Sequence, residues 1–278
     1  MRKVELVPGI GSSVLGFGCA PILGAVGAKD AERALGTAFD AGITHYDVAR
    51  SYGYGEAEKF LGRFLRGRRD QVVLASKFGI RATWRAHLAR PLKPVVRMLR
   101  SRRTPVPVSE APAPTQPRRD PFHEHIEITA SNMERNLEET LRALRTDHLD
   151  LYFVHEPVQP VRDPDAVLAC ASRLQREGKI RGFGVAFSWE MRGRLAQLLD
   201  GAGVWQFGCS PGFSDYEEMR QERADGGNVL FSALSRRGER TVEQTLLQLW
   251  RDFPRSVVLC SMFNPNHILS NARLAAGG

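Results

Sequence analysis

Residues 45–58 read HYDVARSYGYGEAE, and this stretch decides how the rest of the chain is interpreted. It follows a predicted helix over residues 30–40 and a short apolar strand. Asp47 therefore falls at the tip of a strand, and Tyr52 lies in the glycine-rich turn that comes next. In barrels of alternating strands and helices, catalytic groups collect where strands end and loops begin. We therefore expect the functional site at this end of the strands.

Strands and helices alternate from this stretch to both ends of the chain. Lys77 and His155 each end a later predicted strand, so two more polar side chains stand at strand tips. Eight strand–helix repeats within 278 residues favour a closed parallel barrel. The sequence thus predicts an α/β protein, a single (β/α)8 TIM barrel domain over residues 1–278, with an N-terminal β-hairpin cap within residues 3–18. The predicted barrel strands are residues 14–18, 43–46, 71–76, 149–154, 181–185, 204–207, 228–231 and 256–259.

The helix predicted over residues 128–145 carries an explicit start signal. Ser131 is its expected N-cap, and Glu134, three residues later, completes a capping box. The pattern places the start of this helix directly after the insertion described below.

The composition is that of a globular protein, with 42% hydrophobic and 25% charged residues. No apolar run approaches about 18 residues, so no membrane span is expected. The N-terminus lacks the apolar block of a secretory signal. Four cysteines stand far apart with no CxxC pair, which predicts reduced thiols and a cytoplasmic location.

The net charge of +8 is concentrated in one insertion, residues 81–125. Residues 81–119 hold ten Lys or Arg against one acid, a charge of +9, which leaves −1 for the rest of the chain. The insertion begins with a basic, partly helical piece and continues as a Pro-rich segment that we expect to be partly flexible. It is interpreted as a flexible excursion or as a lid over an anionic ligand. Contact with nucleic acid or a membrane is less favoured because no base-stacking aromatic pattern accompanies the arginines, and His123-Glu124-His125 alone predicts no metal site.

The polar residues at the strand tips support proton donation to a carbonyl oxygen. A phenol has an unperturbed pKa near about 10, so Tyr52 donates poorly at neutral pH unless its anion is stabilised. The ammonium of Lys77 is expected to lower the pKa of Tyr52, and Asp47 to hold that ammonium in place. His155 is expected to orient the carbonyl. No side chain supplies the electron pair, so a nicotinamide cofactor is its natural source.

The same residues lie in motifs that resemble those of the aldo-keto reductase family, in order and spacing. The resemblance covers the whole chain except residues 81–125, and it implies that Tyr52 is the proton donor, that Lys77 and Asp47 tune it, and that His155 positions the substrate carbonyl. The motifs are FGCAP (17–21), YDVARSYGYGEAEKFLG (46–62), ASKFG (75–79), NLEETLRAL (136–144), DHLDLYFVHEP (147–157), GKIRGFGV (178–185) and NPNHILSN (264–271).

The resemblance also implies a set of cofactor-binding residues. Gln206 matches the family's glutamine that holds the carboxamide, and Phe231 matches the tyrosine that stacks on nicotinamide. Ser232 and Leu234 match the segment near the pyrophosphate, and Asn271 the asparagine on the adenine side. The full implied set is Gly18, Asp47, Ala186, Phe187, Gln206, Phe231, Ser232, Leu234, Ser261, His267 and Asn271.

Five further positions depart from the family pattern. Ala186-Phe187 stand where the family has Ser-Asn, so two hydrogen bonds to the carboxamide are not implied. Ser261-Met262 and His267 replace the Lys-Ser pair and arginine that grip a 2′-phosphate, which weakens the phosphate site. NADPH (NADP) remains the expected cofactor, with NADH as an alternative.

The sequence therefore predicts an NAD(P)(H)-dependent oxidoreductase that interconverts an aldehyde or ketone and an alcohol, with Tyr52 as general acid/base. A small-molecule carbonyl or alcohol is the expected partner, and the protein is expected to be a monomer or small homo-oligomer. Two alternatives stay open: a barrel with weak cofactor binding that acts as a binding or regulatory subunit, and an NAD-dependent sugar or polyol dehydrogenase.

Overall fold

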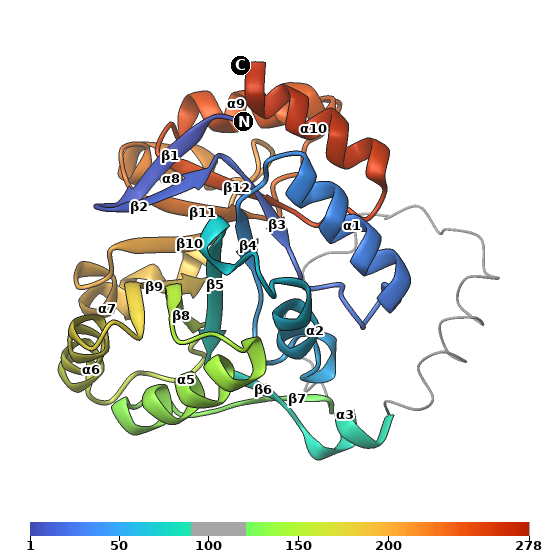
Figure 1. Ribbon diagram of the computed structural model, residues 1–278. Coiled ribbons are helices and arrows are strands. Elements are labelled where there is room, and N and C mark those ends of the chain that lie inside the picture. The colour runs from blue at the N-terminus through green and yellow to red at the C-terminus, as the bar shows by residue number, and fades with distance from the viewer. Residues whose placement is uncertain (90–120, 278) are drawn as a thin grey trace.

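The computed structural model describes residues 1–89 and 121–277. Eight parallel strands close into a barrel, and Figure 1 shows helices arranged around it. The barrel order follows the chain, from β3 next to β4 and β5 through β8 and β9 to β12, which pairs with β3. The predicted (β/α)8 barrel is confirmed. Its strands are β3 (Leu15–Gly18), β4 (His45–Asp47), β5 (Val73–Phe78), β8 (Leu149–His155), β9 (Ile180–Phe187), β10 (Val204–Gly208), β11 (Asn228–Phe231) and β12 (Ser256–Cys260).

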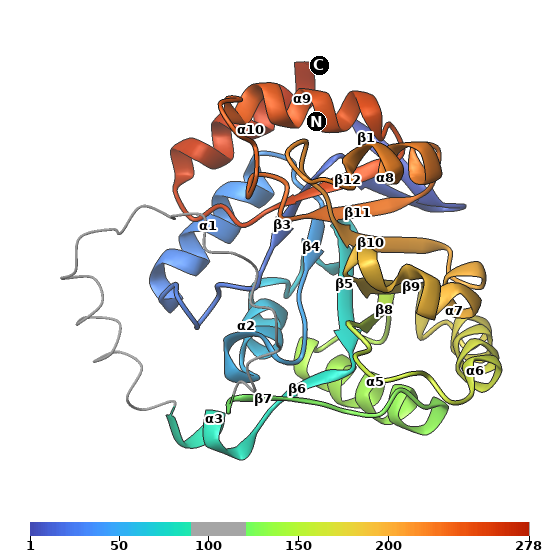
Figure 2. The same cartoon turned by 180° about the vertical axis from the view of Figure 1, so that it is seen from behind.

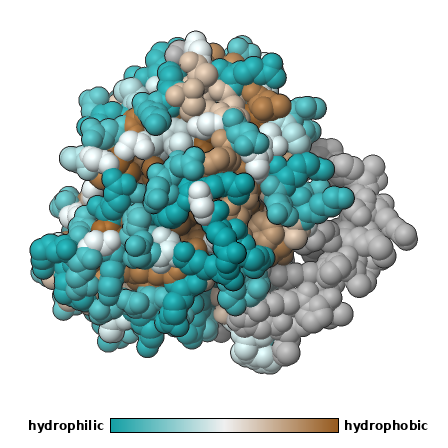
Figure 3. Space-filling model, in the orientation of Figure 1, coloured by the Kyte–Doolittle hydropathy of each residue, from teal (hydrophilic) through white to brown (hydrophobic). Residues whose placement is uncertain are grey.

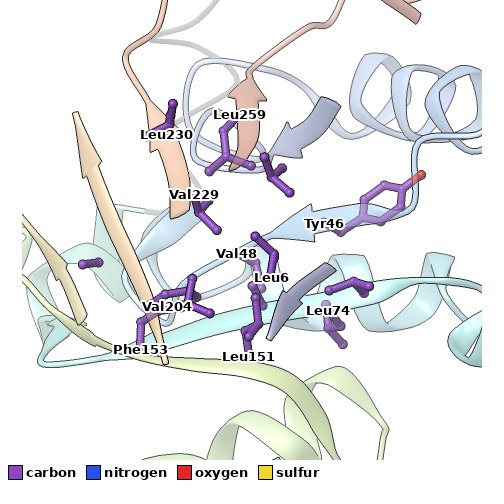
Figure 4. Packing of buried hydrophobic residues seen from close by; sticks show 14 of the residues in the cluster. Leu6, Tyr46, Val48, Leu74, Leu151, Phe153, Val204, Val229, Leu230 and Leu259 are labelled. Atoms are coloured by element: carbon purple, nitrogen blue, oxygen red, sulfur yellow. The ribbon is translucent and has the colours of Figure 1, made fainter. Parts of the chain in front are cut away.

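The expected N-terminal hairpin is present and closes the barrel at the end where its strands begin. β1 (Lys3–Val7) and β2 (Ile10–Ser13) pair antiparallel, and Leu6 and Ile10 are almost fully buried. Figure 4 shows Leu6 among side chains of the hydrophobic core. Arg181 donates to the Gly9 carbonyl in the turn, which attaches the hairpin to the start of β9. The opposite end of the barrel is left open for a site.

Helices on the outside of the barrel follow the predicted alternation, with local differences in their bounds (Figure 2). The helix expected over residues 189–200 is a 3-10 segment, Trp189–Leu195, followed by α7 (Ala196–Asp200). The last helix, α10, is longer than the sequence suggested, and it lies beside the N-terminus, where Arg2 N donates to Ala275 O. Besides α7, the helices around the barrel are α1 (Ala28–Asp40), α2 (Ala57–Phe64), α5 (Ala130–Leu144), α6 (Pro164–Arg176), α8 (Tyr216–Arg223), α9 (Val242–Asp252) and α10 (Pro265–Gly277).

The expected capping of α5 by Ser131 is wrong. Thr129 is the N-cap, and its side chain accepts a hydrogen bond from the backbone N–H of Asn132. Thr129 has the extended backbone that an N-cap requires, whereas Ser131 already lies inside the helix. The capping signal of the sequence was therefore assigned two residues too late.

The insertion begins and ends in a short antiparallel ribbon. β6 (Ile80–Ala82) pairs with β7 (His123–His125), and α3 (Trp84–Ala89) follows β6. The remainder of the predicted basic helical piece and most of the Pro-rich segment lie outside the described residues.

On the face shown in Figure 3, hydrophilic side chains dominate and hydrophobic areas are small. Within the described ranges, no helix is long and apolar enough to cross a bilayer.

Candidate active site

A cavity of about 740 Å³ opens at the C-terminal ends of the barrel strands. This volume lies within the range of small-molecule and cofactor sites. Because the strands are parallel and closed, one residue at or near the tip of each of them reaches the same cavity. In chain order these residues are Gly18, Asp47, Lys77, His155, Ala186, Gln206, Phe231 and Cys260.

Lys77 is the centre of a buried hydrogen-bond network in this cavity. Its ammonium forms an ion pair with Asp47 and donates to Val48 O at 3.2 Å and to Tyr52 Oη at 3.3 Å. The side chains of Lys77 and Asp47 are only 2% and 3% exposed, so both charges depend on each other. The expected Asp47–Lys77 pairing is therefore present, with Tyr52 as its third member.

The glycine-rich turn brings the Tyr52 hydroxyl back over the strand tips. Tyr52–Tyr54 forms one 3-10 turn in which Gly53 has a φ of 60°. A Cβ at Gly53 would lie 2.6 Å from Ile22 O, so the backbone conformation and the space both favour glycine. The YGYG sequence thus serves the geometry of the turn that carries Tyr52.

The pKa of Tyr52 is raised above its ordinary value. Burial is the largest cause, because it disfavours the phenolate, whereas the charge and hydrogen bond of Lys77 lower the pKa. Lys77 thus acts in the expected direction, and burial outweighs it in the net shift of the Tyr52 pKa. At neutral pH Tyr52 is a phenol, and because its oxygen accepts from Lys77, its own proton is available to a ligand in the cavity.

His155 packs against Tyr52 in the lining of the cavity. The two rings lie edge to face with centroids 6.0 Å apart. Burial, followed by the charges of Lys77, His125 and His123, holds the pKa of His155 well below its ordinary value. The imidazole is therefore neutral at pH 7, and it can act as a hydrogen-bond donor or acceptor but not as a cation. Its Nδ1 is buried and has no partner among the described residues.

Gln206 extends the Asp47–Lys77–Tyr52 network along the cavity lining. Its Nε2 donates to the second carboxylate oxygen of Asp47 at 2.9 Å, so both Asp47 oxygens are engaged. Its Oε1 is buried and has no partner in the part of the chain that the structure describes. A buried amide oxygen without a partner costs free energy, and a ligand N–H in the cavity would satisfy it.

All but one of the residues implied to bind a cofactor line the cavity. Ala186, Phe231, Ser232, Leu234, His267 and Asn271 line it together with Gly18, Asp47, Gln206 and Ser261. Gly18 leaves no room for a side chain, since a Cβ there would meet Ser261 Oγ at 2.8 Å. Ser232 has a φ of 54°, and this bend turns the chain after β11 along the cavity.

Phe187 is the exception. Its side chain is fully buried in an aromatic cluster with Trp189, Trp205 and Phe207, at centroid distances of 6.3, 5.6 and 6.2 Å. It does not line the cavity, because alternate residues of β9 point to opposite faces and Ala186 takes the inner one. The structure thus separates Phe187 from the other implied residues.

One charged cavity residue was not singled out from the sequence. Glu156 lines the cavity directly after His155, with a φ of 42°. Its position between a strand-end histidine and Pro157 was the only signal, and it does not distinguish a functional glutamate from a loop residue. His123 and His125 lie on β7, and no group of three or more His, Cys, Asp or Glu in residues 1–89 and 121–277 is placed to hold a metal ion.

The family model described as "Aldo/keto reductase family" matches residues 14–197. "Aldo-keto reductase YhdN" of Bacillus subtilis is 29% identical over 186 residues, which cover 64% of this chain and 44% of that protein. "D-threo-aldose 1-dehydrogenase" of a Pseudomonas species is 29% identical over 185 residues, covering 64% and 50%. In these two comparisons the chain spans about half the length of the curated relatives.

Solved structures share the fold over nearly the whole chain. A putative aldo-keto reductase from Pseudomonas aeruginosa superposes with a TM-score of 0.72 at 21% identity, covering 99% of this chain and 94% of that one. An aldo-keto reductase from Klebsiella pneumoniae in complex with NADPH gives a TM-score of 0.64 at 20% identity, covering 99% and 89%. At such identities the likeness concerns the fold.

Proposed function

Because the chain belongs to the aldo/keto reductase family, we propose that it is a nicotinamide-dependent oxidoreductase that interconverts an aldehyde or ketone and an alcohol, with Tyr52 as general acid. The observation that carries the proposal is the buried Asp47–Lys77–Tyr52 network, which lines a cavity of cofactor size. Such a network has a direct chemical use at a polarised carbonyl.

In this proposal each side chain has one task. Tyr52 donates its proton to the substrate oxygen as negative charge develops there, which lowers the barrier. The Lys77 ammonium, 3.3 Å away, stabilises the phenolate that remains. Asp47 keeps Lys77 charged and in place, and neutral His155 donates a hydrogen bond that orients the carbonyl.

The cavity fits a nicotinamide cofactor. The unpartnered Oε1 of Gln206 would accept from the carboxamide, and the ring of Phe231 offers a stacking surface. Bound there, the reduced cofactor would supply a hydride to the carbonyl carbon. We propose NADPH as the cofactor, supported by the NADPH complex of the Klebsiella pneumoniae relative, with NADH as the alternative because no Lys or Arg lies at Ser261, Met262 or His267.

The test is coenzyme-dependent reduction of a panel of small aldehydes and ketones. The reaction is monitored through the decrease in absorbance of the reduced nicotinamide. Turnover with NADPH or NADH is expected, and the ratio of kcat/KM values ranks the two coenzymes. Absence of turnover, together with absence of coenzyme binding in calorimetry, would contradict the proposal. That pair of results would favour a binding or regulatory barrel instead.

A second direction of the same chemistry is favoured by one comparison. The relative from Pseudomonas is a D-threo-aldose 1-dehydrogenase, which suggests assaying sugars and polyols with NAD and NADP as well. In that direction Tyr52 acts as a base, so its phenolate is the active form. We propose that a single small-molecule site serves both directions within the domain over residues 1–278.

A further inference from the structure

Glu156 is the charged residue of the cavity that the proposed chemistry does not use. It lines the cavity immediately after His155, at the end of β8. The cavity's other charged carboxylate, Asp47, is bound by Lys77 and Gln206. No ion pair or hydrogen bond to the Glu156 carboxylate is found within residues 1–89 and 121–277. The cavity therefore presents one carboxylate that is open to a ligand.

The backbone holds Glu156 in this place despite a conformational cost. Its φ of 42° lies in the left-handed region, which costs a residue with a Cβ on the order of 1–2 kcal/mol. The Glu156 N–H donates to Ala186 O at 2.7 Å, and Pro157 follows. Glycine would adopt the same backbone without that cost. A carboxylate retained at a strained position beside a reactive centre points to a role for its side chain.

The charge of Glu156 acts at the site of proton transfer. It is one of the groups that raise the Tyr52 pKa, so it lies within electrostatic reach of the Tyr52 hydroxyl. A substrate whose carbonyl oxygen meets Tyr52 and His155 consequently places its neighbouring substituent near Glu156. A carboxylate accepts hydrogen bonds and repels other anions. The charge of Lys77 is shared with its partner Asp47, so the Lys77–Asp47 pair has no net charge to set against that of Glu156.

We propose that Glu156 determines substrate specificity: it selects carbonyl compounds with a hydrogen-bond donor, a hydroxyl or an amine, next to the carbonyl, and it rejects oxo acids. This inference rests on the proposed reductase function and names its substrate class. Glu156 attracts a hydroxyl or amine of the substrate and repels the carboxylate of an oxo acid. The repulsion is the larger effect when the substrate carboxylate lies close to Glu156.

A matched pair of ketones tests the exclusion. Hydroxyacetone and pyruvate both have three carbons and differ in a hydroxymethyl group against a carboxylate. We expect the ratio of their kcat/KM values, hydroxyacetone over pyruvate, to fall at least about tenfold in Glu156→Gln, because the repulsion between the two carboxylates is removed. Glu32→Gln on the exposed face of α1 makes the same charge change far from the cavity and is expected to leave the ratio unchanged. An unchanged ratio in Glu156→Gln would overturn the inference.

Direct binding separates this inference from the proposed function, because it needs no turnover. Benzoate, benzyl alcohol and benzylammonium are titrated into the wild type and Glu156→Gln, and dissociation constants are measured by calorimetry. Glu156→Gln should bind benzoate more tightly than the wild type does. It should bind benzyl alcohol or benzylammonium, whichever the wild type prefers, more weakly. Equal constants for all three ligands in both proteins would refute the role of Glu156, even if carbonyl reduction were observed. Lack of turnover with shifted binding constants would instead refute the reductase function alone.

Discussion

Lys77 Nζ lies 3.3 Å from Tyr52 Oη, and the same ammonium is paired with Asp47 on its other side. A single cation thus connects a buried carboxylate at the tip of β4 to a phenol in the following turn. Burial raises the pKa of the phenol and Lys77 opposes that effect. The raised pKa keeps Tyr52 protonated at neutral pH, and in the proposed reaction Lys77 would support the anion after the proton has left.

Tyr52→Phe tests the acid directly. The variant removes one hydroxyl and keeps the ring, so we expect kcat for carbonyl reduction to fall by about 10²- to 10⁴-fold. Coenzyme affinity, measured by calorimetry, should stay within about twofold. The melting temperature should change little, because the lost hydrogen bond is only one of three made by Lys77. Retained activity in a folded variant would contradict the assignment of Tyr52.

The pH dependence follows from the raised Tyr52 pKa. Reduction needs the protonated phenol, so kcat for reduction should be flat through neutral pH and fall only above about pH 10, where tyrosine ordinarily titrates. Oxidation of the alcohol needs the phenolate and should rise over the same alkaline range. Initial rates after brief dilution into each buffer give both profiles. If kcat for reduction fell with a midpoint near neutral pH, the effect of Lys77 on the Tyr52 pKa would be larger than that of burial.

Lys77→Met should cost both stability and activity. It leaves the Asp47 charge buried without a cation, and breaking a buried pair in this way typically costs about 3–5 kcal/mol. Urea denaturation measures the loss in the free energy of unfolding. The double variant Asp47→Asn/Lys77→Met should recover part of the stability but none of the activity, since the phenolate remains unsupported. Equal stability of the single and double variants would argue against the pairing.

Acid stability should depend on His45 at the start of β4. Burial lowers the pKa of His45 from 6.5 to about 4, although the charge of Asp47 opposes the shift. The unfolded chain therefore binds one more proton than the folded chain between these pH values, so stability falls as pH drops from 6.5 towards 4. At about 1.4 kcal/mol for each pKa unit, His45 accounts for a loss of about 3 kcal/mol.

Comparison of urea denaturation at pH 7 and pH 4 tests this dependence. His45→Gln is expected to have a shallower pH dependence than the wild type, while the contribution of His155 remains in both proteins. If the free energy of unfolding depended on pH equally in both proteins, His45 would not be the group responsible for the loss of stability in acid. Ser12 Oγ, 3.1 Å from His45 Nδ1, stays available to the glutamine amide.

Packing of α2 against α5 depends on Gly62. A Cβ at this position would lie 2.4 Å from Leu144 O, a backbone atom that cannot move aside cheaply. Gly62→Ala should therefore destabilise the protein by about 1–3 kcal/mol despite the better helix propensity of alanine.

Gly36→Ala on α1 is the matched control. Nothing lies within 4 Å of a Cβ at Gly36, so the same substitution should stabilise the protein by about 0.5–1 kcal/mol. If α2 approaches α5 this closely, chemical denaturation of the two variants should give changes in the free energy of unfolding of opposite sign. A stabilised Gly62→Ala would mean that the two helices separate without cost.

Periodicity and residue order were enough to predict the barrel, its N-terminal hairpin and the strand tips that carry Asp47, Lys77 and His155. Each of these depends on patterns repeated along the chain, and a parallel barrel brings strand ends together regardless of its loops. The capping of α5 was harder to predict, since Thr129 and Ser131 are both good N-caps and only the backbone path selects between them.

The tertiary structure decided what depends on side-chain direction and burial. It turned Phe187 into an aromatic cluster while Ala186 faced the cavity, because neighbouring residues of β9 lie on opposite faces. It set the direction of the Tyr52 pKa shift, because burial raises this pKa and the charge of Lys77 lowers it. Which effect is larger depends on how deeply Tyr52 is buried and how far it lies from Lys77. It also placed Glu156 on the cavity wall, a position that depends on the left-handed turn after His155. The sequence determined which residues reach the strand tips, and the packing around them determined their chemistry.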